Sequence, residues 1–264
     1  MANLNNLSEQ EIKQNLLEHY KDFDIKVFDT LSSTNDFAKD LINSNKFQNG
    51  TTIIANSQTN GRGRFARNFY SPANTGIYFS TILEKSLPIK DVSLITIISA
   101  IAVCRAITRL TNFNPQIKWI NDVYLNNKKI CGILVENISD STNLKSKGIV
   151  AGIGINISTE NFPKDIQDKA GSIMCNDLSR NKLIAEILNN LFDLSENIYN
   201  KKIIEEYKSL SLVLNKEISY KKDNKTYTAT AIDINDSGNL VVKDSNNNIS
   251  LLDCCEISIK AISN

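Results

Sequence analysis

The sequence has 264 residues, with 30 Lys and Arg against 29 Asp and Glu, which gives a formal net charge of +1. A chain of this length can bury a large core in one domain, or in one large and one small domain. Its nearly neutral charge excludes a general attraction to nucleic acid or to anionic membranes, so any anion-binding site must be local.

The sequence has few residues suited to binding metal ions or to acting as nucleophiles. The five cysteines form no C-x-x-C pair and His19 is the one histidine, so zinc sites and Cys/His pairs are not expected. The N-terminal MANLNNLSEQ lacks the features of a secretory signal. The most apolar run, VSLITIISAIAVC (92–104), is shorter than a bilayer-spanning helix and predicts a core helix. We expect free thiols and a cytoplasmic location.

The first part of the chain carries both helix and strand signals. Ser8 and Glu11 form a capping-box signature, and Ser33 or Thr34 is placed to cap a second helix. The apolar face of the first helix is expected to contain Ile12, Leu16, Leu17 and Tyr20. Strands are predicted over 25–29, 51–55 and 76–83, and a long apolar helix over 91–110.

The second part ends in a different pattern. Residues 116–138 predict strands joined by a turn at Asn126 and Asn127. A glycine-punctuated strand follows over 148–157, and a helix over 179–199. After residue 212 the chain has short alternating runs, namely EISYK, TYTATAIDI, NLVVKD, ISLL and EISIK. We therefore expect a mixed α+β domain over 1–211, with helices behind a sheet, and a small five-stranded β-barrel or sandwich over 212–264.

The segment NGRGRFARNFYSP (60–72) forms a local positive patch. Between Asp40 and Glu84 there is no acidic residue. Guanidinium groups bind phosphate or carboxylate oxygens in pairs, and glycines let a backbone approach a ligand, so the segment predicts an anion-binding loop. A solvated basic loop without function explains the same charges equally well. The Walker and G-x-G-x-x-G nucleotide loops are absent from the sequence.

Three further segments contain candidate site residues. They are SSTND (32–36), KWINDVYLNNKKICGILVE (118–136) and GIGIN (152–156). Each has a purely structural explanation: a helix cap, an edge hairpin with solubilising lysines, and tight sheet packing. Taken singly, the structural explanation is favoured for the first two.

In their order along the chain, these segments resemble the biotin protein ligases. The resemblance covers most of residues 25–160, and residues 213–264 are similar to the SH3-like C-terminal domain of that family. It implies a class II aminoacyl-tRNA synthetase-like, biotin–lipoate ligase catalytic fold. It also implies ATP-dependent transfer of biotin, through biotinyl-5′-AMP, to a lysine of a biotin carboxyl carrier protein domain.

The resemblance also implies roles for individual residues. Catalysis is expected to depend on Lys129, Arg64 and Arg62. Contacts with biotin are expected from Ser33, Thr34, Gln58, Gly61, Arg62, Arg64, Lys129, Gly132, Gly152 and Gly154. Contacts with ATP and the adenylate are expected from Arg64, Arg67, Phe69, Asn121, Asp122, Lys129 and Asn156. Mg²⁺ is expected with ATP, with ligands that the sequence does not identify.

The sequence departs from the usual pattern of that family at three positions. The family usually has glycine where Ala66 lies and tryptophan where Phe69 lies, and it often has proline where Ile120 lies. Only about two dozen residues precede the first predicted strand, whereas a helix-turn-helix domain needs roughly 50. We therefore expect a short form without repressor activity, acting as a monomer or weak homodimer and binding neither nucleic acid nor membrane.

Two other functions stay open. A lipoate ligase or octanoyl transferase would use the same fold with a different acyl acid. A nucleic-acid-binding protein would use the arginine loop and the small barrel. The acidic residues of the barrel region balance its lysines, which disfavours the latter. A steep salt dependence in filter binding would favour it.

Overall fold

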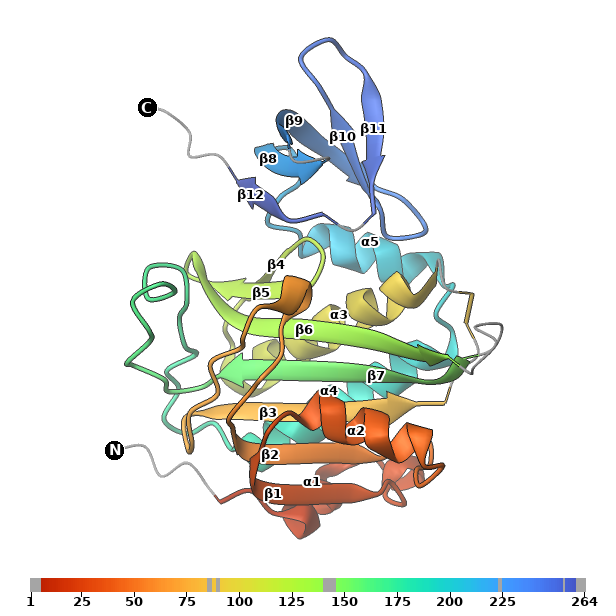
Figure 1. The fold of residues 1–264 in the computed structure, drawn as a ribbon, viewed down its shortest axis with the longest axis vertical. Helices are drawn as coiled ribbons and strands as arrows, with labels where there is room; N and C mark the ends of the chain where they lie inside the picture. The colour runs from red at the N-terminus through yellow and green to blue at the C-terminus, as the bar shows by residue number, and fades with distance from the viewer. Residues whose placement is uncertain are drawn as a thin grey trace.

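The computed structural model describes residues 6–84, 87–88, 91–139, 146–222, 225–253 and 255–259. Figure 1 shows a large sheet and a small sheet, with the helices arranged around the large one. The helices are α1 (Glu9–Asn15), α2 (Thr34–Asn43), α3 (Val92–Thr111), α4 (Arg180–Glu196) and α5 (Lys201–Ser209). The strands are β1 (Ile25–Leu31), β2 (Thr52–Gln58), β3 (Gly76–Leu83), β4 (Gln116–Lys118), β5 (Asp122–Leu125), β6 (Lys128–Ser139), β7 (Ser146–Asn156), β8 (Glu217–Lys222), β9 (Lys225–Ile234), β10 (Leu240–Lys243), β11 (Ile249–Leu252) and β12 (Ile257–Ile259).

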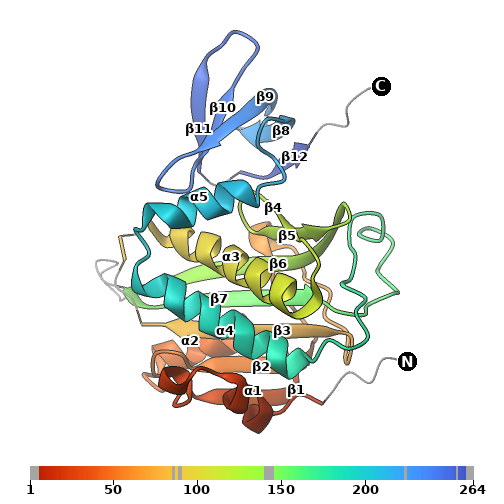
Figure 2. The same cartoon turned by 180° about the vertical axis from the view of Figure 1, so that it is seen from behind.

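The large sheet is mixed. Its seven strands lie in the order β1-β2-β3-β7-β6-β5-β4. Strands β1 and β2 are parallel, and the other neighbouring pairs are antiparallel. Helices α3 and α4 cover one face, and α2 lies on the opposite face (Figure 1 and Figure 2). The predicted α+β fold with helices behind a mixed sheet is confirmed.

Helix α3 is the core helix of the large sheet. It runs for 20 residues, so the argument that this apolar run is too short for a membrane span was wrong. By length and composition alone α3 could cross a bilayer, but 67% of its most apolar 18-residue window is buried inside the protein. Packing against the sheet and α4 therefore accounts for its apolar character.

Three serines cap helices, and the sequence predicts the caps at Ser8 and Ser33 but not the one at Ser179. The hydroxyls of Ser8, Ser33 and Ser179 each accept a hydrogen bond from the backbone N–H three residues further on. Ile12, Leu16 and Tyr20 are buried as predicted. The prediction of one continuous helical face is wrong, because α1 ends at Asn15 and Leu17 is 42% exposed. The N–H of Leu17 donates instead to Asn189 of α4, a tertiary contact that the local sequence does not reveal.

Asparagines set the ends of several elements. Asn126 and Asn127 both have positive φ, of 50° and 61°, which gives the predicted tight turn between β5 and β6. Helix α4 ends at Glu196, and Asn200 caps the following helix by accepting from the N–H of Lys202. Helix α5 was not predicted from the sequence.

The five C-terminal strands form the second sheet, in the order β11-β10-β9-β8-β12. All of its neighbouring pairs are antiparallel, as expected for an SH3-like unit. It docks on the large sheet through the turn between β9 and β10: the indole N–H of Trp119 donates to the Gly238 carbonyl at 2.9 Å, and the Ser93 hydroxyl donates to the Ser237 carbonyl at 3.2 Å. The domain boundary at residues 211 and 212 stays a prediction.

We expect Gly238→Ala to lower the free energy of unfolding by about 1–3 kcal/mol. Gly238 has a φ of +81°, and a Cβ built there would lie 2.3 Å from Ile97 Cδ1 of α3. Urea unfolding measures the change. Ser237→Ala is the matched control, because Ser237 contributes its backbone carbonyl to the contact with Ser93. A Gly238→Ala variant as stable as wild type would contradict this docking.

Candidate active site

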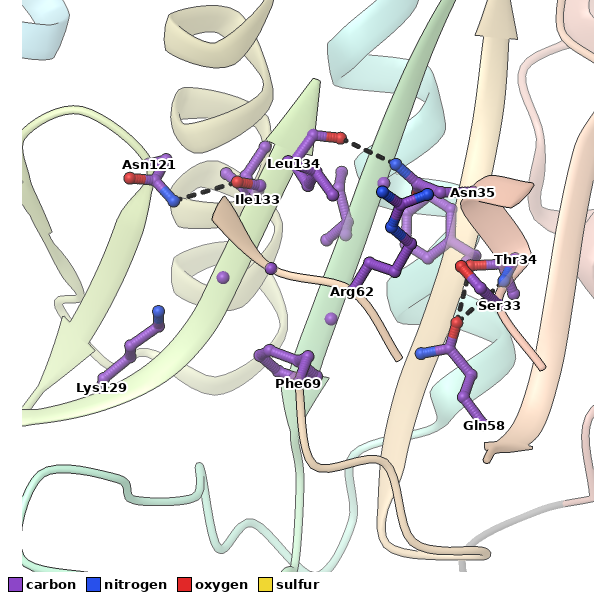
Figure 3. A pocket seen from close by; sticks show the side chains of 16 residues that line it. Ser33, Thr34, Asn35, Gln58, Arg62, Phe69, Asn121, Lys129, Ile133 and Leu134 are labelled. Atoms are coloured by element: carbon purple, nitrogen blue, oxygen red, sulfur yellow. Dashed lines mark hydrogen bonds between the residues drawn. The ribbon is translucent and has the colours of Figure 1, made fainter. Parts of the chain in front are cut away.

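The first cavity lies on the face of the large sheet that also carries α2. It is walled by the start of α2, the end of β2, the arginine loop (60–72), β6 and β7. Ten of the predicted site residues line it, namely Ser33, Thr34, Gln58, Arg62, Phe69, Asn121, Lys129, Gly132, Gly152 and Gly154. In Figure 3, Ser33, Thr34 and Gln58 lie on one side of the view and Asn121 and Lys129 on the other.

A hydrogen-bonded cluster of neutral side chains forms one end of this cavity. Gln58 Oε1 accepts from the Thr34 backbone at 2.9 Å and from the Thr34 hydroxyl at 3.1 Å. The Gln58 amide N–H donates to Ser71 Oγ at 2.9 Å. Ser80 Oγ lies 2.8 Å from Thr34 Oγ1 and 2.6 Å from Asn35 Oδ1. These fixed donors and acceptors suit a neutral polar group.

Asn35 is a cavity residue that the sequence reasoning missed. It is 95% buried, because its exposed fraction is 5%. Its amide N–H groups donate to Glu136 Oε2 at 2.8 Å and to the Leu134 carbonyl at 3.3 Å. Asn35 lies inside the SSTND motif, which could have indicated its role. The motif was explained by the helix cap at Ser33, so Asn35 was not considered.

The floor of the cavity is formed by glycines. A Cβ built on Gly152 would lie 1.9 Å from Asn35 Oδ1, and one built on Gly154 would lie 2.5 Å from Phe69 Cε1. No other residue fits at these positions without moving its neighbours. The Phe69 ring therefore lies directly against the sheet, between the two halves of the site (Figure 3).

A second, open cavity adjoins the first. Its wall holds Gly63, Arg67, Asn68, Phe69, Tyr70, Lys118, Asp122, Tyr124, Lys129, Asn156, Phe162, Asp165, Ile166, Lys169, Ala170, Glu256 and Ser258. Phe69 and Lys129 line both cavities. The ammonium of Lys129 lies 2.7 Å from Asp122 Oδ1. Burial lowers the pKa of Lys118, and the carboxylates of Asp122 and Glu256 oppose that shift.

Asn156 offers an unused acceptor in the second cavity. It is 5% exposed, and its amide N–H donates to the Gly171 carbonyl at 3.0 Å. Its Oδ1 is buried and has no hydrogen-bond partner among the residues that the structure describes. Because an unpaired buried acceptor is costly, this atom points to a ligand with a donor group.

Each predicted arginine has its own protein partner. Arg62 Nη1 lies 2.5 Å from Asp36 Oδ1, Arg64 Nη1 donates to Asn121 Oδ1 at 3.0 Å, and Arg67 donates to both oxygens of Glu256. Burial opposes ionisation of Asp36, but hydrogen bonds from Lys39 and Arg62 outweigh it and lower the pKa of that carboxyl. The loop places three cations around the cavities.

The backbone of the arginine loop is closed by its own hydrogen bonds. Phe69 N donates to the Gly61 carbonyl and Gly63 N donates to the Arg67 carbonyl, each at 2.8 Å. Ala66 has a φ of +55°, a left-handed conformation that glycine adopts without strain. This explains why glycine suits the position. The peptide bond between Trp119 and Ile120, where proline is often found, is cis.

The described part of the chain has no group of three or more His, Cys, Asp or Glu that could hold a metal ion. Asp122 lines the second cavity beside several cations. Mg²⁺ is commonly bound by one or two carboxylates together with the phosphates of a ligand. The described residues offer a carboxylate at Asp122 but no complete set of protein ligands.

The two cavities lie largely within a segment of known type. Residues 27–156 match the Biotin/lipoate A/B protein ligase family. This segment runs from β1 to the end of β7 and supplies most of the walls of both cavities. The matched segment is 130 of the 264 residues, a little under half of the chain.

Two similar proteins show what this chain resembles along its length. The Bacillus subtilis protein named Bifunctional ligase/repressor BirA is 35% identical over 169 residues, which are 63% of this chain and 51% of that protein. The Mycobacterium tuberculosis protein named Biotin–[acetyl-CoA-carboxylase] ligase is 25% identical over 203 residues, 72% of each chain. The chain spans about half the length of the Bacillus relatives that it matches.

Solved structures agree on the fold. Biotin protein ligase from Aquifex aeolicus, in complex with biotin and ATP, has a TM-score of 0.76 at 23% identity, covering 90% of this chain and 99% of that one. The predicted fold is thereby confirmed, and the family match over residues 27–156 agrees with the resemblance inferred from the motifs. The roles of single residues stay predictions.

The contact between Arg67 and Glu256 gives a pH-dependent prediction. Hydrogen bonds from Arg67 lower the pKa of the Glu256 carboxyl. A carboxyl with a lowered folded-state pKa stabilises the fold above its unfolded pKa and loses that contribution as pH falls through the lowered value. Glu256→Gln should therefore reduce amide-exchange protection of residues 61–69 at neutral pH, and the difference from wild type should vanish in acid.

Hydrogen-exchange mass spectrometry at matched pH measures this difference. The control is Glu206→Gln, which removes the partner of Arg105 between α3 and α5. It should leave residues 61–69 unchanged. Equal protection of the loop in wild type and Glu256→Gln at every pH would contradict the account.

Proposed function

We propose that this chain is a biotin protein ligase, which joins biotin to a carrier-protein lysine at the cost of ATP. The observation that supports this most is the pair of adjoining cavities that share Lys129 and Phe69. The first cavity has a neutral end rich in fixed hydrogen-bond partners and cations at Arg62 and Lys129, and the second is lined by more cations than carboxylates. A reaction that joins a vitamin acid to a nucleotide needs this pairing.

The neutral end of the first cavity suits the biotin head group. Thr34, Gln58 and Ser33 surround this end, and the flat bicyclic ring would lie beside the floor at Gly152 and Gly154, next to Asn35 and Phe69. The valerate chain would run toward Lys129 and Arg62, whose charges attract its carboxylate. Gly61 and Gly132 would let the backbone approach the ligand closely.

The cationic cavity suits ATP. The unpaired Asn156 Oδ1 would accept from the exocyclic amino group of adenine. Phe69 would pack beside the base, and Arg64, Arg67, Asn121 and Asp122 would surround the phosphates. Arg67 would exchange Glu256 for phosphate when the nucleotide enters.

The chemistry proceeds in two balanced steps. A carboxylate oxygen of biotin forms a bond to the α-phosphorus of ATP, and the bond to pyrophosphate breaks. An uncharged acceptor lysine then attacks the acyl carbon of biotinyl-5′-AMP, forming an amide as AMP leaves and the amine loses a proton. In the first step two anions meet, so Lys129, Arg64 and Arg62 act mainly by stabilising negative charge.

Mg²⁺ would be held mainly by the phosphates, with Asp122 as a carboxylate ligand. Bound there, it supplies further neutralisation of phosphate charge. The protein partner is proposed to be a biotin carboxyl carrier domain. Absence of repressor activity, a monomeric or weakly dimeric state, no binding to nucleic acid or membrane, and a cytoplasmic location are kept as sequence-based predictions.

The direct test measures pyrophosphate release from ATP with biotin and, separately, with lipoate. Release with biotin alone, followed by labelling of an added carrier domain, is the expected result. Release with lipoate but not biotin would favour the lipoate ligase alternative. Binding calorimetry with biotin, with and without ATP, gives an independent measure.

Lys129→Ala should slow adenylation by roughly 10²–10³-fold, the usual effect of removing a charge-stabilising donor from a reacting centre. Single-turnover pyrophosphate release measures the rate. The neighbouring Lys128→Ala is the matched control, because Lys128 Nζ donates to the Asp168 carbonyl and does not line the first cavity. A wild-type rate for Lys129→Ala would remove this residue from the site.

Arg64→Ala should leave the fold intact and release biotinyl-5′-AMP roughly tenfold faster or more, because a hydrogen bond to a charged group is lost. Trapping the released adenylate with hydroxylamine in solution measures the leak. Arg109→Ala is the control, since Arg109 is 73% exposed and pairs with Glu186 on the helical face. Normal retention in Arg64→Ala would refute the assigned role.

A further inference from the structure

The hydroxyl of Tyr207 is a buried polar group for which the proposed chemistry has no use. Tyr207 lies on α5, the helix that joins the two sheets, and its exposed fraction is 0%. Its hydroxyl donates to the Ile120 carbonyl at 2.9 Å. This carbonyl directly precedes Asn121 and Asp122, which line the two cavities.

The segment from 116 to 121 is held by parts of the chain that follow α4. Ile117 N donates to the Leu210 carbonyl and Leu212 N donates to the Ile117 carbonyl, each at 2.7 Å. The Trp119 indole donates to Gly238, and Ile120 accepts from Tyr207. Of these supports, the one from Tyr207 acts at the residue next to the site.

Asn121 connects this segment to the arginine loop through hydrogen bonds. Its amide N–H donates to the Ile133 carbonyl at 3.0 Å, and Ile133 N donates back to the Asn121 carbonyl at 3.0 Å. Asn121 Oδ1 then accepts from Arg64 at 3.0 Å. A continuous chain of hydrogen bonds and one peptide unit therefore links the Tyr207 hydroxyl to the Arg64 guanidinium.

The chemistry of a buried phenol fits a fixed donor. Burial raises the pKa of Tyr207 well above its usual value, so the hydroxyl keeps its proton at every physiological pH. Without that hydroxyl, the Ile120 carbonyl would lose its hydrogen-bond donor in a dry interior. The segment would then relax to find another donor, and Asn121 would move with it.

We propose that Tyr207 is a positioning residue whose hydroxyl, through the Ile120 carbonyl and Asn121, holds Arg64 over the reacting centre. The inference rests on the proposed ligase function and goes further, because it assigns the helix before the second sheet a part in holding the adenylate. Tyr207 touches no reactant and acts only through the residues that do.

The test compares Tyr207→Phe with Tyr20→Phe in the full chain. Tyr20 is the matched control: it is 7% exposed, and its hydroxyl donates to Asp193 at 2.9 Å, between the 3-10 turn Glu18–Tyr20 and α4. Both variants keep the ring and lose one hydroxyl. Thermal melts first establish a temperature at which both are folded, and all kinetics are measured there.

Tyr207→Phe should release biotinyl-5′-AMP roughly three- to tenfold faster than wild type, while Tyr20→Phe should match wild type. The KM for biotin should stay within about twofold of wild type, because the Thr34 and Gln58 end of the cavity does not depend on Asn121. In an Arg64→Ala background, Tyr207→Phe should add little to the leak, since both changes act on the same contact.

Other outcomes are decisive against it. An unchanged leak in Tyr207→Phe, or equal leaks in both tyrosine variants, would overturn the inference and reduce Tyr207 to a packing residue. Additive leaks in the double variant would overturn the route through Arg64. If wild type releases no pyrophosphate with biotin and ATP, the proposed function fails instead, and the two failures are distinguished.

Discussion

The register of three neighbouring strands creates the space that the rest of the site uses. Tyr78 of β3 pairs with Gly154 of β7, which pairs with Gly132 of β6. Two residues further along β3, Ser80 pairs with Gly152 of β7, which pairs with Leu134 of β6. Glycines therefore lie side by side on one face of the sheet, and a shift by one residue would turn side chains into that hollow. Asn35 and Phe69 occupy its two sides.

Three cations around this hollow have carboxylate partners. Arg62 pairs with Asp36, Arg67 with Glu256, and Lys129 with Asp122. The first two pairs are partly exposed to solvent and therefore contribute little to stability. Their small energetic value makes them easy to exchange for an anionic ligand, which is the property that a binding site of this kind needs.

The sequence predicted the elements with strong local signals. Serine caps, the apolar run of α3 and the Asn126–Asn127 turn carry their own information, and each was found where expected. The motif residues around the first cavity were also predicted, because the resemblance supplied contacts between segments far apart in the chain. Asn35, Asp36 and Glu256 were missed, since their importance lies in tertiary partners that no local pattern encodes. Helix α5 was missed because the break at Asn197 to Asn200 resembles a loop leading into the second sheet.

The segment that forms the second sheet contributes residues to the site and to its support. It contributes Glu256 to the wall of the cationic cavity, and its Gly238 carbonyl receives the Trp119 indole one residue before the peptide unit that Tyr207 holds. A fragment ending after the large sheet would leave an indole N–H without its acceptor and the edge strand β4 without its neighbour at Leu210 to Leu212. The two sheets thus form one functional unit, and evolution could not discard or exchange the smaller one without rebuilding the edge of the larger.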